Sequence, residues 1–139
     1  MKPYVIQKIY ADGYERVAIL KELGKERTCN VHFLEYDEYL QHGEESRKKE
    51  QGTVLEGNLS IELVTFSKTT DATLSHYQTI PASPHIEATI EVSQIIDKYS
   101  VYARSSLSDN TILIEFEHAV NYKAGERVWV SGSLELSEV

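Results

Sequence analysis

The sequence predicts an all-β protein: a small curved antiparallel sheet or barrel, with an N-terminal β-hairpin extension and little helix. Apolar and polar side chains alternate with a period of two through most of the chain, which is the pattern of half-buried strands. Asp12-Gly13 separates two such segments and favours a tight hairpin turn with Gly13 at positive φ. Near the C-terminus, Gly132 interrupts an alternating segment that runs from Lys123 to Leu136. A glycine inside a strand usually marks a bulge or a sharp bend, which the closure of a small barrel requires.

The first 35 residues predict three strands, of which the first two are joined by the Asp12-Gly13 turn. For residues 15–23 a helix is the competing interpretation, because apolar residues there also fit one helical face. The alternation favours a strand. The expected strands span residues 4–10, 14–23 and 27–35.

Residues 36–52 break the alternation and predict a charged connection. Residues 36–40 fit a single helical turn, and the charges between residues 44 and 50 are typical of a solvated helix or a mobile loop. The only run of three bases in the chain lies here, at Arg47, Lys48 and Lys49. Acidic residues flank this run on both sides, which makes it a poor candidate for binding nucleic acid.

Apolar and polar side chains alternate through residues 53–66, which predicts a strand with one buried face and one solvent-exposed face. The buried face is expected to hold Leu55, Leu59, Ile61 and Leu63, and the wet face Glu56, Asn58, Ser60 and Glu62.

After residue 66 the sequence predicts a long connection and then the rest of the barrel. Residues 67–84 are rich in serine, threonine and proline, and long connections in compact domains are functional or mobile. Alternating segments at residues 86–92, 99–105 and 112–117 predict strands that precede the closing segment. The side chains expected inside are Leu59, Ile61, Ile90, Val92, Ile112, Ile114, Val128 and Val130.

The length of 139 residues fits a single domain, with N-terminal strands (1–35), the charged connection (36–52) and a barrel-like core (53–139). No apolar run approaches the roughly 18–20 residues that span a bilayer, and no signal-peptide pattern is present. We therefore expect no membrane association and a cytoplasmic location. The single cysteine, Cys29, excludes an intrachain disulfide and is expected to be a buried thiol on an apolar strand face.

The net charge of −8 lies largely in the C-terminal part of the chain. Residues 85–139 carry nine acidic and four basic side chains, a balance of −5. This sign opposes long-range attraction to a phosphate backbone. Charge therefore disfavours nucleic acid as a partner, although a local basic patch can override it.

Residues 86–136 read as three strands, a short connection and a glycine-initiated strand. This order resembles the OB-fold, whose fourth strand often carries a glycine, an acidic residue, two alternating valines and a second glycine. The matching residues are Gly125, Glu126, Val128, Val130 and Gly132. The resemblance implies a five-stranded barrel, but little chain remains for a fifth strand. Either the bend at Gly132 splits the last segment in two, or an earlier segment such as residues 53–66 completes the barrel.

Four side chains on two of these strands combine aromatic rings with arginine: Tyr102, Arg104, Arg127 and Trp129. These residue types dominate protein-binding hot spots, and OB-type modules use them to stack bases and hold phosphates. A structural interpretation is also open, in which Trp129 packs under the N-terminal hairpin and the arginines pair with Glu115 and Glu117. We expect a non-catalytic module that binds a protein partner through this face. An OB-type single-stranded nucleic-acid binder is the alternative.

No motif points to catalysis or to a cofactor. A Gly-x-Ser-x-Gly elbow and a glycine-rich phosphate loop are both absent from the sequence. Glu115 and Glu117 lie two apart on one strand, where they are expected to be the wet side rather than an acid–base pair. Cys29 and His32 have metal-like spacing, but residues three apart on a strand face opposite sides. The expectation is a protein that is not an enzyme and holds no metal and no cofactor.

Overall fold

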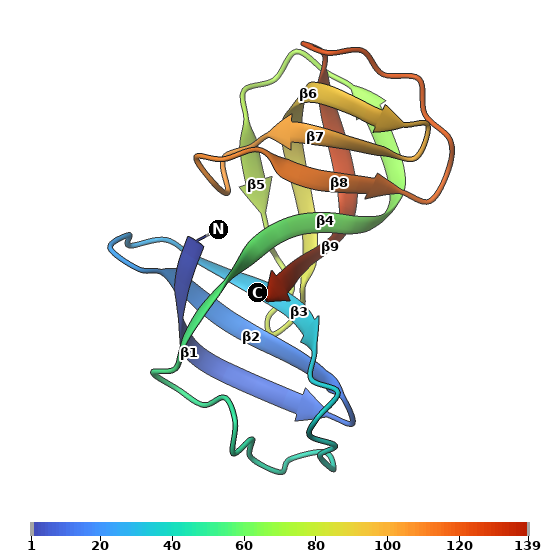
Figure 1. The fold of residues 1–139 in the computed structure, drawn as a ribbon. Helices are drawn as coiled ribbons and strands as arrows, with labels where there is room; N and C mark the ends of the chain where they lie inside the picture. Colours follow the sequence, from blue (N-terminus) through green and yellow to red (C-terminus); the bar gives the residue numbers. More distant parts are fainter. Residues whose placement is uncertain (1, 139) are drawn as a thin grey trace. The chain divides into compact units, whose positions relative to one another are not determined.

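A computed structural model describes residues 2–138 (Figure 1), and all of its regular elements are β-strands, which confirms the all-β class. Residues 15–22 form a strand rather than a helix. Residues 36–40 contain a turn but no helix, so the helical turn that the sequence allowed there is wrong. The strands are β1 (Lys2–Asp12), β2 (Glu15–Glu22), β3 (Thr28–Leu34), β4 (Val54–Thr69), β5 (Ser75–Tyr77), β6 (His85–Asp97), β7 (Ser100–Arg104), β8 (Ile112–Phe116) and β9 (Arg127–Glu138).

The chain folds into two compact units. The first unit comprises the chain up to Asn58, Ile80–Pro84 and the chain from Glu135 on. The second comprises Leu59–Thr79 and His85–Leu134. The two long strands β4 and β9 each contribute one part to each unit. The expectation of a single domain stays a prediction.

In the first unit, the consecutive antiparallel strands β1, β2 and β3 form a meander, drawn in blue to cyan in Figure 1. The start of β1 pairs antiparallel with the start of β4, across Lys2–Val5 and Val54–Gly57. On the other side, β3 pairs in parallel with the end of β9, where His32 lies opposite Glu135. Because β9 is also hydrogen-bonded to β4, these five strands close into a ring.

The second unit repeats this arrangement with the roles of the long strands exchanged. Its meander is β6, β7 and β8, drawn in gold to orange in Figure 1. The start of β9 pairs antiparallel with β6, and the later part of β4 pairs in parallel with β8, with Ser60 opposite Leu113. β4 is therefore the strand that completes this ring, one of the two possibilities that the sequence left open. The two parallel pairs make the sheet mixed, whereas alternation alone suggested an antiparallel one.

The core of the second unit matches the sequence prediction. All eight side chains expected inside it are at most 4% exposed. Leu63 is the exception on the predicted buried face of β4, because it is 60% exposed and has a φ of 54°. The β4–β8 register shifts between Ile61 and Val64, so a β-bulge turns Leu63 outward and places Val64 in the core. Ser60, predicted to be wet, is buried and donates to Glu62 at 2.6 Å.

Gly57 and Gly132 occupy equivalent positions in the two units. A Cβ on Gly57 would lie 2.6 Å from the carbonyl oxygen of Ser137, and a Cβ on Gly132 would lie 2.6 Å from that of Glu62. Neither glycine has a positive φ. Glycine is therefore required at both places by the close approach of β4 and β9, which leaves no space for a side chain.

The turns that lead into β4 and β9 also correspond. Both have a glycine in the third position, Gly52 with a φ of 91° and Gly125 with a φ of 90°. Gly52 donates its N–H to the carbonyl of Ile6 and Gly125 donates to that of Val92, each at 2.8 Å. The structure thus contains a repeated pairing scheme that the sequence does not reveal as a repeat.

Candidate functional site

The structure places all four predicted binding residues on the outer face of β7, β6 and β9 in the second unit. Arg104 and Arg127 lie on either side of Glu91, one on β7 and the other on β9. In the next register position along the face, Trp129 lies opposite Thr89 of β6. Tyr102 lies two residues from Arg104 on β7, and its side chain is 41% exposed. The alternation of strand side chains therefore brings the four residues onto one face.

Glu91 neutralises part of the positive charge on this face. Its carboxylate contacts Arg104 Nη1 at 2.9 Å and Arg127 Nε at 3.5 Å. Arg127 also donates from Nη1 to the carbonyl oxygen of Ala72 at 3.0 Å. The interpretation that pairs the arginines with Glu115 and Glu117 is wrong, because cross-strand neighbours on one face pair first. The row from β7 to β9 carries two positive charges and one negative charge.

Trp129 is half-buried and packs against a neighbour that sequence reasoning missed. The rings of Phe66 and Trp129 meet edge to face, with centroids 5.5 Å apart and an interplanar angle of 75°. The Lys68 ammonium lies 5.9 Å from the Trp129 ring centroid, within cation–π range. Phe66 itself is 53% exposed, so this aromatic pair presents apolar surface to solvent. We name Phe66, Lys68, Tyr102, Arg104, Arg127 and Trp129 the aromatic–arginine face.

An open hollow of about 440 Å³ lies beside Phe66. Its wall includes Thr65 to Ser67 on one side and His118 to Tyr122 on the other. The hydroxyl groups of Ser67 and Tyr122 are hydrogen-bonded at 2.8 Å, which holds the two sides together. Such a hollow next to an exposed aromatic ring offers room for an apolar side chain of a partner.

The second unit as a whole is acidic, with nine acidic and five basic side chains. Partial burial raises the pKa of Glu115, and the neighbouring carboxylates of Glu62, Asp97 and Glu117 raise it further. These groups repel one another and any approaching anion. The second unit is therefore negative overall, although the aromatic–arginine face itself carries Lys68, Arg104 and Arg127 against Glu91.

In the first unit, the connection 36–52 is held by a buried arginine. Arg16 is 1% exposed and donates to the carbonyl oxygens of Gly13 at 2.9 Å and Glu38 at 2.6 Å. The Glu38 carboxylate accepts hydrogen bonds from Ser46 and from the N–H of Arg47, and these bonds hold its pKa below the usual range. This arrangement organises the charged segment.

Cys29 and His32, whose spacing in the sequence resembles that of metal ligands, each have a glutamate near them. Burial raises the pKa of the Cys29 thiol to about 12, and the Glu22 carboxylate adds to this effect. The thiol is therefore protonated and weakly nucleophilic at neutral pH. His32 Nδ1 contacts Glu135 at 2.7 Å, the residue opposite it on β9. Among residues 2–138, no three histidine, cysteine or carboxylate side chains converge as metal ligands.

Comparison with known proteins adds no relative: no family model, no curated protein and no solved structure matches the chain. Within the described residues there is no helix whose length and hydropathy would suit a membrane span.

Proposed function

We propose that the chain is a non-catalytic, cytoplasmic binding module whose aromatic–arginine face contacts a protein partner. The observation that carries the proposal is the exposed Phe66–Trp129 pair beside the open hollow. Aromatic rings and arginines of this kind supply most of the binding energy in protein interfaces. The arrangement supports a contact in which a partner's apolar side chain enters the hollow beside the Phe66–Trp129 pair.

An OB-type single-stranded nucleic-acid binder is the alternative. The five-stranded ring of the second unit, three of whose strands form a meander, supports the OB resemblance. The Trp129 side chain offers an aromatic surface on which a base could stack. Against it, Glu91 occupies both arginines and the whole unit carries a net negative charge. Phosphates gain little from such a surface. A protein partner is therefore the favoured occupant.

Trp129→Ala is the variant that tests the proposal. We expect it to weaken partner binding by about 2 kcal/mol, as the loss of an interface hot spot does, and to leave the fold intact because the ring is half-buried. The measurement is affinity capture from the native organism with nuclease-treated extract, followed by titration of the purified partner. Tyr99→Ala is the matched control, because Tyr99 lies in the β6–β7 turn and is 45% exposed.

Two outcomes would contradict the proposal. If Trp129→Ala unfolds the domain, the tryptophan belongs to the core and the face is not a binding site. If the wild-type protein instead binds a labelled oligothymidine tightly, and the affinity falls steeply with added salt, the nucleic-acid alternative replaces the protein partner.

A further inference from the structure

The outer edge of β1 carries two outward-facing residues without a backbone partner in the part of the chain that the structure describes. At one end of this edge Ile6 bonds to the turn before β4 (N···O 2.9 Å), and at the other Gly13 bonds to Leu40 (N···O 2.6 Å). Strand residues alternate between the two edges, so Ile9 and Ala11 face the same way as Gly13. Among residues 2–138, none forms a backbone hydrogen bond with Ile9 or Ala11 on this side.

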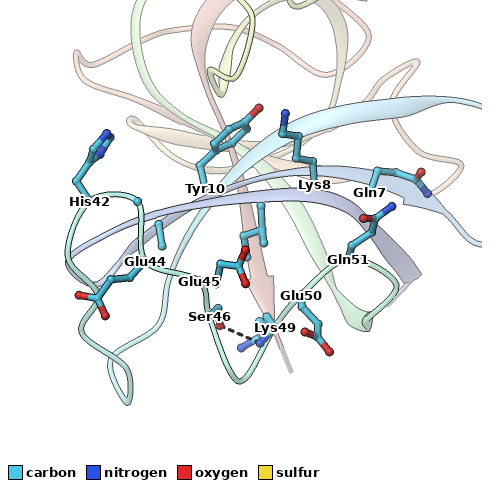
Figure 2. Close-up of a pocket in the computed structure, with 13 residues that line it drawn as sticks. Gln7, Lys8, Tyr10, His42, Glu44, Glu45, Ser46, Lys49, Glu50 and Gln51 are labelled. Carbon is cyan, nitrogen blue, oxygen red and sulfur yellow. Dashed lines mark hydrogen bonds between the residues drawn. The ribbon is translucent and has the colours of Figure 1, made fainter.

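A pocket of about 470 Å³ lies along this unpaired edge (Figure 2). Residues 7–11 of β1 form one wall, and residues 42–46 and 49–51 of the charged connection form the other. Pockets of this volume are typical of ligand sites. The chain after Leu40 therefore bows away from β1 instead of pairing with it.

Comparison with the second unit shows that this outward course of the connection is additional to the pairing scheme that the two units share. The same backbone bond closes the connection in both units, from Val120 to Lys98 at 2.8 Å and from Leu40 to Gly13 at 3.0 Å. Four residues then separate Val120 from the turn glycine of the second unit, whereas eleven separate Leu40 from that of the first. The additional residues of the first unit build the outer wall of the pocket.

The pocket is acidic. Glu44, Glu45 and Glu50 line it, and among residues 2–138 the carboxylates of Glu45 and Glu50 have no ion-pair partner. Of the two lysines in the wall, Lys49 is engaged, because its ammonium group contacts the carboxylates of Glu35 and Glu138. The other, Lys8, has its ammonium group 5.2 Å from the Tyr10 ring centroid and offsets only one of the three carboxylates that line the pocket. The remaining negative charge favours a ligand with cationic groups.

We infer that this pocket binds a short, extended, lysine- or arginine-bearing peptide segment of a partner protein, which pairs as a strand with Ile9 and Ala11. Two outward residues provide up to four backbone hydrogen bonds, since each carries one donor and one acceptor. The edge between Ile6 and Gly13 is about 20 Å long, which matches a segment of about five residues. Basic side chains of the segment would meet Glu45 and Glu50.

The probe is the labelled pentapeptide acetyl-Val-Lys-Val-Lys-Val-amide, measured by fluorescence anisotropy at low salt against the full-length protein. We expect saturable binding that the matched glutamate peptide, acetyl-Val-Glu-Val-Glu-Val-amide, does not show. Two N-methylated versions of the lysine peptide, methylated at odd or at even positions, test the strand pairing. Because only alternate amides of a strand face the protein edge, one version should lose binding and the other should keep it.

Ala11→Pro removes the outward N–H of Ala11 without removing a bond to β2, as proline is tolerated on an open strand edge. We expect it to weaken binding about fivefold, the value of one hydrogen bond. The double variant Glu45→Gln/Glu50→Gln should weaken binding and flatten its salt dependence. Trp129→Ala should have no effect, which separates this site from the aromatic–arginine face.

Absence of binding at millimolar lysine peptide would overturn the inference. Equal binding of the two N-methylated peptides would also overturn it, since a purely ionic contact does not depend on backbone amides. If Ala11→Pro fails to fold, the N-methylated pair and the glutamine variants decide the question with a folded protein.

Discussion

At the scale of single residues, the fold disfavours the charged form of Glu115. Partial burial and the carboxylates of Glu62, Asp97 and Glu117 raise its pKa in the folded protein. A raised pKa means that the folded state binds the proton more tightly than the unfolded state does. The free energy of unfolding therefore falls as pH rises from the unfolded pKa through the folded one.

Glu115→Gln should accordingly stabilise the protein at pH 7. We expect a gain of less than about 1 kcal/mol, because water screens an exposed carboxylate. Urea unfolding at pH 7 and pH 4 measures it, and the gain should shrink at pH 4, where the wild-type carboxyl is largely protonated. Asp109→Asn is the control, since it also removes one negative charge but Asp109 is not one of the carboxylates that raise the pKa of Glu115. An equal gain at both pH values would show that Glu115 is not repelled by its neighbours.

Several single residues were predictable because one local rule governs each of them. Gly13 has the predicted positive φ, 64°, although the two-residue loop is Gly13-Tyr14 rather than Asp12-Gly13, because Asp12 pairs with Glu15. The eight barrel side chains followed from strand alternation alone. Leu63 was not predictable, because a positive φ at leucine is rare and leaves no trace in the pattern. The same bulge decides the side-chain directions that follow it on β4, so Phe66 was missed as the neighbour of Trp129.

At the scale of elements, the crossing of β4 and β9 depends on two glycines. Gly132→Val would place atoms 2.6 Å from the Glu62 carbonyl and 3.0 Å from Val64 Cγ2. Gly57→Val meets the equivalent carbonyl of Ser137 at the same distance. We expect each variant to cost on the order of 1–3 kcal/mol, because overpacking forces the backbones apart. Denaturant unfolding measures the loss.

Ser131→Val is the control for the glycine variants, since it adds a β-branched side chain to the same strand on its outer face. It should change the free energy of unfolding by less than about 0.5 kcal/mol. If Gly132→Val is no worse than Ser131→Val, the close approach of the two strands does not exist in solution.

The pairing partners of β4 could not be predicted from the sequence. Alternation shows which side chains of a strand face the core, but it does not say which distant strand lies beside it. The parallel register of Ser60 with Leu113 and of His32 with Glu135 joins segments far apart in the chain. β5 was missed for a related reason, because three residues, Ser75–Tyr77, are too few to show a period.

At the scale of the whole chain, the repeated pairing scheme is invisible because its spacings differ between the units. Four residues separate Gly52 from Gly57, but six separate Gly125 from Gly132. The connection before the turn differs as well, and its longer version builds the pocket on β1. Backbone geometry is kept while loop length and side chains are free to change, so an aligned sequence repeat does not survive.

The candidate site could be predicted only in part from the sequence. Tyr102, Arg104, Arg127 and Trp129 could be assigned to one face because two alternating strands carry them. Glu91, Phe66 and Lys68 complete the face through cross-strand register and through the bulge. The pocket could not be predicted from the sequence. A strand edge stays unpaired only because no other segment of the folded chain lies beside it, and the sequence of the strand does not determine that.

The first unit depends on the C-terminal part of β9, which a chain ending at Leu134 would lack. That chain loses the parallel partner of β3, the buried side chain of Leu136 and the Glu138 contact of Lys49. Removing a buried leucine alone costs about 2–5 kcal/mol. We expect amide hydrogen exchange to accelerate in β1, β2 and β3 more than in β6, β7 and β8.

Two further variants separate the causes of that loss. Leu136→Ala in the full-length chain removes the side chain but keeps the backbone of β9, so it should produce part of the effect. Gly57→Ala should be costly in the full-length chain and harmless in the shortened one, because the Ser137 carbonyl and the Leu136 side chain that a new Cβ would meet are then gone. A cost that is the same in both chains, or exchange that accelerates equally in both meanders, would contradict the closure of the first unit by β9. The pairing with β9 closes the strands of the first unit into a ring. It also brings Glu138 to Lys49, which lines the pocket on β1. The exchange measurement therefore tests the structural basis of the peptide site without any ligand.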